Sequence, residues 1–544
     1  MRTARRTVRC YIAAVIAAGL VFTGAPAAPA APAQHHHPPA APVLRGINLE
    51  QATVLDLQAA MNRRQLSSVD LTNFYLKRIR ALDPMLNSVI ETSPHALRDA
   101  ALSDLHRRRH GPRSPLEGIP VLLKDNVDTD DRLHTTAGSF ALLEAEPKRD
   151  AFLVQRLRAA GAIILGKANL SEWANFRSLA SSSGWSARGG QANNPYVLDR
   201  NPCGSSSGSA VAVSAHLATV TIGTETNGSI VCPSGANGVV GIKPTLGLVS
   251  RSGIVPISAQ QDTAGPITRN VTDAAAVLSV VQGFDRRDPA TRDAKPFDDR
   301  DYLDALDPDA LAGARIGVWR EPAAENPEVA AVLEDAVQAL RDRGAVIVDN
   351  LTLPGLDEAL AAQFPALLVE FKHDLNAYLD ATPGDHPADL AGLIEFNEEH
   401  ADLELPFFGQ EIFELAEETD GDLNNPEYLQ LRETATGGAR AAIDTAMAAH
   451  DLDAIVAPTN NPAWVTDLEN GDNFDGFVSS SSPGAISGYP NLTVPAGFGA
   501  GGELPVGVSF FGSRWSEPTL IAIGYAFEQA TEARRPPEFL PTLP

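Results

Sequence analysis

Serine and glycine cluster on both sides of an apolar core between Asn201 and Thr245. The run CGSSSGS occupies residues 203–209, and a second polar turn, TETNGS, occupies residues 224–229. Glycine accepts positive φ without a side-chain clash, so such turns let backbone N–H groups converge. A serine among converging amides can attack a carbonyl carbon while the amides stabilise the resulting oxyanion. The stretch therefore indicates nucleophilic catalysis. Its alternation with apolar segments of helix and strand length argues against a flexible linker.

A lysine follows a strand-length apolar run in the segment GIPVLLKDN, residues 118–126. Lys124 comes directly after Val-Leu-Leu, and this position favours burial over solvation. Burial destabilises the ammonium form and lowers the pKa of a lysine toward the range of a general base. Lys124 is therefore a candidate base. The alternative is an edge lysine whose ammonium group reaches solvent along its apolar stem.

The elements that must position these residues alternate between helices and strands. Residues 210–217 predict a short buried helix, and residues 218–223 predict a strand. Near the N-terminus, Thr53 predicts the cap of one helix. Ser67 with Asp70 predicts the capped start of a second helix, which we expect to end at Pro84.

A β-α-β unit is predicted further along the chain. Strands at 315–319 and 345–348 flank a helix that begins at Asn326-Pro327 and ends near Gly344, with a cap, a proline at the first position and a glycine past the end. Residues 350–450 are acidic and predict a mostly helical insert. Further strands are expected at 452–457, 492–495 and 506–511, with a last helix at 518–531. This alternation indicates an α/β fold with one large sheet.

The composition and the N-terminal residues restrict the compartment and the partners. The 544 residues carry a formal net charge of −25, which argues against nucleic acid and anionic membranes as partners. Arginines precede an apolar run at residues 11–23, and A-x-A repeats follow, which predicts a signal peptide over residues 1–33 and secretion. The apolar run is too short to be a stable membrane anchor. Arg5-Arg6 leaves both the twin-arginine and the general export route open.

Residues 34–46 are rich in proline, alanine and histidine and predict an extended tether before a folded body that begins at Ile47. Three consecutive histidines at 35–37 could bind a metal ion weakly, but no nearby residue completes a site.

Three segments resemble the amidase signature family. They are GIPVLLKDN around Lys124, the 201–245 stretch, and the C-terminal LDAIVAPT with SGYPNLTVPAGF. The resemblance covers residues 47–535 and is strongest to the secreted bacterial peptide amidases. It implies an amidase domain over residues 47–544 with an amidase-signature α/β fold, one large mixed sheet flanked by helices on both faces. It also implies hydrolysis of a small-molecule or peptide amide without a metal or other cofactor, and it leaves the oligomeric state open.

The resemblance implies a Ser–cisSer–Lys triad. Ser229 falls at the position of the nucleophile, and Ser205 falls at that of the bridging serine, which follows a cis peptide bond. Lys124 falls at the position of the base. Supporting positions fall on Ser206 and Asp262.

The same resemblance places an oxyanion hole at the backbone N–H groups of Thr226, Asn227, Gly228 and Ser229. Asn227 departs from the glycine that many members have there. The departure is tolerable because the hole uses backbone atoms and because asparagine accepts unusual dihedral angles.

Other readings of the same residues compete with this one. Ser206 lies at the centre of a G-x-S-x-G match, the nucleophile motif of α/β-hydrolases, but loop-forming residues precede it instead of a buried strand. Cys203 or Cys232 with Lys124 could form a thiol amidase of the nitrilase kind. In an exported chain, a disulfide or two buried thiols are the alternatives, and the sequence leaves both open. His216 lies in an apolar helix, which favours packing over catalysis. A non-enzymatic solute-binding protein is a further class.

The resemblance favours peptide C-terminal amides as substrates, with small aliphatic or aryl amides second. A transferase subunit that acts on aminoacyl-tRNA is the family's other main role, and the predicted export and the negative charge oppose it. The helical insert at 350–450 is expected to shape the pocket.

Overall fold

The computed structural model describes residues 41–297, 299–472 and 476–543. The predicted signal peptide and the first part of the tether lie outside the described residues. For its last part the tether prediction is wrong, because β1 (Val43–Leu44) pairs with β2 (Ile47–Asn48) as a small hairpin. Arg45 and Gly46 both have positive φ, which is the two-residue turn that such a hairpin requires.

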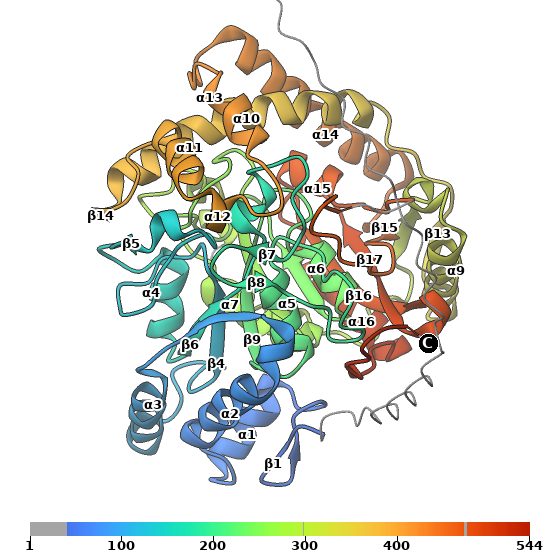
Figure 1. The fold of residues 1–544 in the computed structure, drawn as a ribbon. Helices are drawn as coiled ribbons and strands as arrows, with labels where there is room; N and C mark the ends of the chain where they lie inside the picture. The colour runs from blue at the N-terminus through green and yellow to red at the C-terminus, as the bar shows by residue number, and fades with distance from the viewer. Residues whose placement is uncertain (1–40, 298, 473–475, 544) are drawn as a thin grey trace, which may run out of the picture. The chain divides into compact units, whose positions relative to one another are not determined.

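An eleven-stranded mixed sheet runs through the described chain (Figure 1). Its order is β13 (Val346–Val348), β12 (Arg315–Val318), β15 (Ala454–Pro458), β17 (Leu504–Phe511), β16 (Asn491–Gly499), β10 (Val240–Lys243), β11 (Thr263–Thr268), β9 (Val220–Glu225), β4 (Pro120–Lys124), β6 (Ile163–Ala168) and β3 (Val89–Thr92). β4 is parallel to both β9 and β6, so the carboxyl ends of these three strands meet at one edge of the sheet.

Helices cover both faces of the sheet. On one face, α7 (Val271–Val281), α16 (Glu517–Thr531) and α9 (Pro327–Asp342) pack in series. On the other lie α5 (Ser207–Ser214) and α6 (Val231–Ala236), all of whose residues are buried. Burial all round suits their small and apolar sequences. The predicted β-α-β unit is confirmed, because β12 and β13 are parallel and α9 connects them.

The N-terminal helices begin at the predicted caps. α1 (Val54–Asn62) and α2 (Ser68–Leu86) each start with a capping box, formed by Thr53 and by Ser67. The prediction that Pro84 ends α2 is wrong: Pro84 lies in the last turn, and Asn87 ends the helix in the left-handed conformation. The Asn87 N–H donates to the carbonyl of Asp83, so this end is capped without the proline.

The remaining elements are short or lie outside the sheet. They are α3 (Ala96–His110), α4 (Phe152–Ala159), α8 (Thr291–Ala294), α15 (Ser482–Ser487) and the strand pairs β5 (Glu144–Ala145) with β14 (Gly384–Asp385) and β7 (Trp185–Ser186) with β8 (Gly190–Gln191). No helix within the described residues combines the length and the hydrophobicity needed to cross a bilayer.

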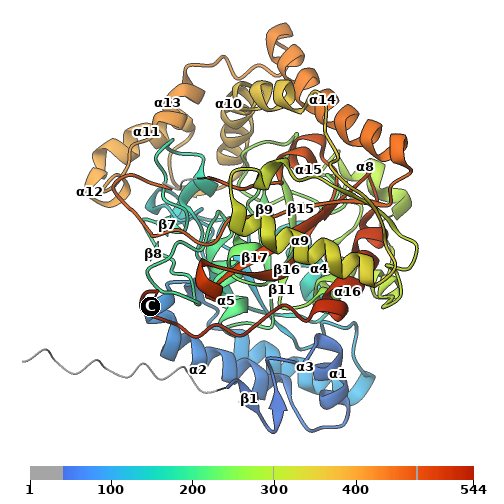
Figure 2. The same ribbon diagram turned by 90° about the vertical axis from the view of Figure 1, so that its right-hand side faces the viewer.

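Residues 350–450 form a helical layer. Its helices are α10 (Leu356–Ala381), α11 (Leu390–Glu399), α12 (Ala401–Glu404), α13 (Glu411–Glu417) and α14 (Pro426–His450). They gather at one end of the sheet, and α1–α3 lie at the other (Figures 1 and 2). α10 and α14 are joined by a buried ion pair in which the Arg432 guanidinium donates to both carboxylate oxygens of Glu370, with Nε 2.7 Å from Oε1. Ser258 and Tyr428 also donate to Glu370.

We expect Arg432→Met to lower the free energy of unfolding by about 3–5 kcal/mol, because it leaves a buried carboxylate without its counter-charge. The shift of the thermal and urea unfolding midpoints measures this effect. Arg320→Met is the control, because Arg320 pairs with Asp349 at the surface and such pairs contribute about 0–1 kcal/mol. Equal shifts for the two variants would contradict the assignment.

Candidate active site

The parallel arrangement of β4 and β9 brings Lys124 against Thr224. Both residues lie at the carboxyl ends of their strands, and Leu123 and Ile222 are paired in register. The Lys124 amine is fully buried and lies 2.7 Å from Ser205 Oγ and 2.9 Å from Thr224 Oγ1. The Thr224 carbonyl is a third acceptor, at 3.2 Å. The predicted buried lysine is therefore confirmed, and every atom that it contacts through a hydrogen bond is an uncharged oxygen.

Burial shifts the proton equilibrium of this amine. Removal from water lowers the pKa of Lys124 to about 7, although the charges of Asp262 and Glu225 oppose the shift. A large share of the amine is consequently unprotonated at neutral pH. In that form its nitrogen can accept a proton from a neighbouring hydroxyl.

Ser205 lies at the entrance to α5 and is itself buried. The peptide bond between Gly204 and Ser205 is cis, where the family resemblance implies one. A Cβ at 204 would overlap the hydroxyl of Ser171, so any larger residue there would force this side chain to move. Ser205 thus presents its hydroxyl to Lys124 from a segment with little space around it.

The turn at 226–229 follows directly after β9 and is held by Glu225. The buried Glu225 carboxylate accepts from the N–H groups of Ile230, at 2.7 Å, and Val231, at 3.1 Å. Gly228 has a φ of +85°, which glycine adopts without strain. Within the described chain, the backbone N–H groups of residues 226–229 donate no hydrogen bond. Four consecutive amide donors are therefore left for a ligand beside the Ser229 side chain.

These residues line a cavity of about 400 Å³, which we call the Ser229 cavity. Its polar wall contains Gly204, Thr226, Asn227, Gly228 and Ser229, and its aromatic and aliphatic wall contains Phe176, Phe364, Leu367, Trp464 and Phe477. The structure thus brings the predicted oxyanion-hole residues to one cavity, next to the Ser205–Lys124 pair. Phe364 and Leu367 belong to α10, so the 350–450 segment forms part of the cavity wall.

The two supporting positions contact the same turn. Asp262 Oδ1 accepts from the Thr226 hydroxyl at 2.6 Å, and burial raises the pKa of this carboxyl. The Ser206 N–H donates to the Ser229 carbonyl at 3.1 Å, and its hydroxyl bridges the N–H and the carbonyl of Thr224. Ser206 and Asp262 therefore hold the turn and its neighbouring strand in place. The hydroxyl that contacts Lys124 through its own oxygen belongs to Ser205.

Sequence reasoning missed the parts played by Thr224, Glu225 and Asn126. Thr224 Oγ1 accepts from Lys124 and also from the Asn126 side-chain amide at 3.0 Å. Glu225 closes the turn by the contacts given above. All three lie inside the quoted motifs, within two residues of a predicted site residue. Their adjacency was the available signal, but the pairing across strands that gives them these contacts is not readable from one sequence.

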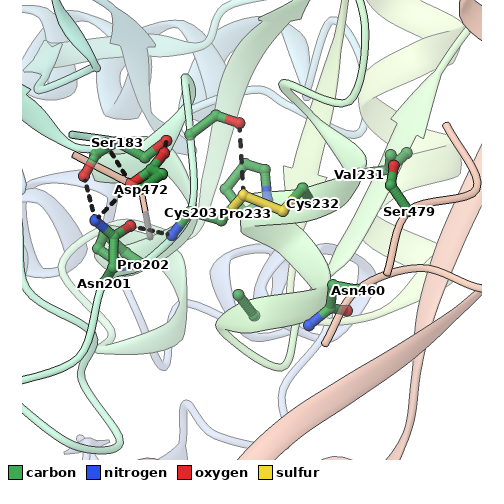
Figure 3. Close-up of a disulfide and its surroundings, with 12 residues drawn as sticks. Ser183, Asn201, Pro202, Cys203, Val231, Cys232, Pro233, Asn460, Asp472 and Ser479 are labelled. Carbon is green, nitrogen blue, oxygen red and sulfur yellow. Dashed lines mark hydrogen bonds between the residues drawn. A yellow bond between two sulfur atoms is a disulfide. The ribbon is translucent and has the colours of Figure 1, made fainter. Parts of the chain in front are cut away.

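The cysteine question is settled by a disulfide between Cys203 and Cys232, with an S–S distance of 2.02 Å (Figure 3). Neither cysteine carries a thiol, so the thiol-amidase reading is contradicted. The α/β-hydrolase hypothesis is wrong as well, because its motif requires a strand directly before the serine. Here residues 192–206 form a loop after the two-residue strand β8. His216 is buried against Glu50, and burial holds its pKa well below the usual range. No group of metal-binding side chains occurs within the described residues.

Known proteins share both this sequence and this fold. The family model described as Amidase matches residues 70–521. A structure of the peptide amidase PAM with the competitive inhibitor chymostatin is 51% identical with a TM-score of 0.86, and that of the native peptide amidase from Stenotrophomonas maltophilia is 50% identical with a TM-score of 0.84. Each match covers 90% of this chain and 99% of that one. A "Probable amidase" of Arabidopsis thaliana is 44% identical over 91% of this chain and 92% of its own length.

The fold and these relatives define a hydrolase that acts on carbon–nitrogen bonds in linear amides. The chain belongs to the amidase signature family. The amidase-signature α/β fold implied by the resemblance is confirmed as well.

We expect amide hydrolysis to rise as the pH is raised and to level off above about 7, because the pKa of Lys124 lies there and only the neutral amine accepts a proton. The profile of kcat/KM between pH 5 and 9, measured by ammonia release, tests this. A rate that is undiminished at pH 5 would contradict a role for the neutral amine.

Proposed function

We propose that this chain is an exported amidase that hydrolyses the C-terminal carboxamide of peptides through an acyl-serine intermediate on Ser229. The observation that carries the proposal is the hydrogen bond between the buried Lys124 amine and Ser205, beside a turn whose four backbone N–H groups have no acceptor among the residues that the structure describes. The following paragraphs derive the steps from these groups.

In the first step, neutral Lys124 takes a proton from Ser205, and Ser205 takes the proton of Ser229. The Ser229 oxygen attacks the amide carbonyl carbon at the same time. The tetrahedral oxyanion accepts hydrogen bonds from the N–H groups of residues 226–229, each of which contributes about 3 kcal/mol. These donors are held in place before the substrate binds, because Glu225 fixes the turn.

In the second step, the relay runs in reverse. Lys124 returns a proton through Ser205 to the leaving nitrogen, the C–N bond breaks, and ammonia departs from an ester on Ser229. Water then attacks this ester by the same route and releases a carboxylate. Protonation of the leaving group matters more for amides than for esters, because an unprotonated amine leaves poorly, so ester cleavage is expected as a side activity.

Three observations support a peptide carboxamide as the substrate. The peptide amidase structures resemble this chain at about half sequence identity over nearly their whole length. The aromatic and aliphatic wall of the Ser229 cavity suits the apolar parts of a peptide. None of the described residues that line this cavity is a lysine or arginine, so the carboxylate of a free-acid peptide would lack a counter-charge there.

Export is supported by the N-terminal sequence and by the Cys203–Cys232 disulfide, since disulfides persist in oxidising compartments. Mass spectrometry of the protein from fractionated cells tests this part. We expect the protein that is found outside the cytoplasm to lack its first residues. A full-length chain confined to the cytoplasm would contradict export.

We expect Ser229→Ala and Lys124→Ala each to reduce kcat by at least about 10³-fold, because members of a proton relay act as a unit. Ser206→Ala is the matched control in the neighbouring position. Its kcat should fall only about tenfold, since the substitution removes the two hydrogen bonds between the Ser206 hydroxyl and the Thr224 backbone but no group of the relay. Steady-state ammonia release and circular dichroism of each variant measure activity and folding. A folded Ser229→Ala enzyme with full activity would contradict the assignment of the nucleophile.

We expect peptide amides to be hydrolysed with a higher kcat/KM than acetamide or anilides, and the matching free-acid peptides to remain intact. Ammonia release from amides, arylamine release from anilides and mass spectrometry of the peptides measure the panel. Turnover of small amides alone would overturn the peptide preference and favour a general amidase.

A further inference from the structure

The disulfide joins the two segments that carry the site serines. Cys203 directly precedes the Gly204–Ser205 peptide bond, and Cys232 lies in the first turn of α6, three residues after Ser229. The two Cα atoms are 6.0 Å apart (Figure 3). A covalent bond thus links the segment of the bridging serine to the segment of the nucleophile.

The Cys203 side of this link is held by a polar network. The Cys203 N–H donates to Asn201 Oδ1 at 2.8 Å, and the Asn201 side-chain amide donates to the Ser183 carbonyl at 2.9 Å. The Asp472 carboxylate accepts from both the N–H and the hydroxyl of Ser183 (Figure 3). Burial raises the pKa of Asp472 to about 6. This network therefore holds the Cys203 end of the disulfide in place.

The Cys232 side is tied to the oxyanion turn. The Cys232 N–H donates to the Gly228 carbonyl at 2.8 Å, which places Cys232 one hydrogen bond away from the amides beside Ser229. Between the two serine segments, the Ser206 N–H also donates to the Ser229 carbonyl at 3.1 Å. A single hydrogen bond of this kind is weak and can stretch, whereas a disulfide fixes the separation of two chains.

The disulfide also lies at the cavity itself. Cys203 and Cys232 both line the Ser229 cavity, and they pack against Trp464 and Ala236. A cross-link whose only effect was on the unfolded chain could lie anywhere in the fold. This one lies where a change in separation would move the reacting groups.

We propose that Cys203 and Cys232 are positioning residues, whose disulfide sets the distance between the Ser205 and Ser229 hydroxyls. The proposal rests on the proposed function, because it assumes the relay through these serines. Without the bond the turn and the segment before α5 can separate, and misplacement by about 1 Å costs about 100-fold in rate. Of the apolar wall, Trp464 packs against the disulfide, whereas Phe364 and Leu367 belong to α10, so substrate binding should be largely preserved.

The test compares the wild type with a Cys203→Ser/Cys232→Ser double variant, at a temperature where circular dichroism shows the variant to be folded. We expect kcat for a peptide amide to fall by about ten- to a hundredfold, with KM changed by less than about threefold. The ratio of amide to ester turnover should also fall, because protonation of the leaving amine depends on the relay and cleavage of an activated ester depends on it less. A loss of stability alone would leave this ratio unchanged.

Dithiothreitol gives a second measurement on the wild-type protein. Two electrons and two protons from the reagent open the bond to two thiols, and we expect the same loss of kcat, restored by oxidised glutathione. The double variant is the control, because it has no bond to reduce and should not respond. Full kcat and an unchanged ratio in the double variant, even with a lower melting temperature, would overturn the proposal. An equal loss on amide and ester would also overturn it. The proposed triad is tested separately, because a Ser229→Ala variant that retains activity would contradict the triad and not the role of the disulfide alone.

Discussion

The site depends on an amine that is fully buried and whose pKa is thereby lowered to about 7. Among the described residues, the hydrogen-bond partners of the Lys124 nitrogen lie on Ser205 and Thr224, and all of them are uncharged. A carboxylate in contact would have stabilised the ammonium form and raised its pKa. Glu225 and Asp262 are close enough to act through their charge, yet their oxygens accept from backbone N–H groups and the Thr226 hydroxyl. The two carboxylates therefore make their hydrogen bonds to other groups, and their charges raise the pKa of Lys124 less than burial lowers it.

Burial alone does not single out this lysine. Lys167 and Lys243 are also fully buried, and burial lowers the pKa of each, to about 8 for Lys243. Lys243 donates to the carbonyl oxygens of Pro244 and Tyr489, which have no proton to pass on. Lys167 donates to Thr135 and to a carbonyl, and Thr135 does not line the Ser229 cavity. Lys124 differs from both because its hydroxyl partner is Ser205, which directly follows Gly204 in the wall of the Ser229 cavity.

Much of the site was predictable from local sequence, because strand-ending lysines and glycine-rich turns have local signatures. The sheet and the buried Lys124 agree with those signatures, whereas the cis bond agrees with what the family resemblance implies. Features that depend on distant contacts were not readable. The sequence left the state of Cys203 and Cys232 open, because a pairing depends on how closely α6, which follows β9, approaches the segment before α5. The Arg45-Gly46 hairpin was missed because Pro and Ala dominate its surroundings. The α2 end was missed because Asn87, not Pro84, provides the cap.

The structure gives a physical reason for the asparagine at 227, where many members of the family have glycine. The expectation was that asparagine replaces glycine there by accepting an unusual dihedral angle, but the positive φ belongs to Gly228. The Asn227 side chain instead donates to Gln363 of α10 at 3.2 Å and accepts from Ser481 at 2.7 Å. Glu225 holds the oxyanion turn from within the sheet, and Asn227 holds it from the helical layer. Asn227 thus adds a contact from α10 to those that Glu225, Ser206 and Asp262 make with the same turn, and a glycine at 227 would remove it.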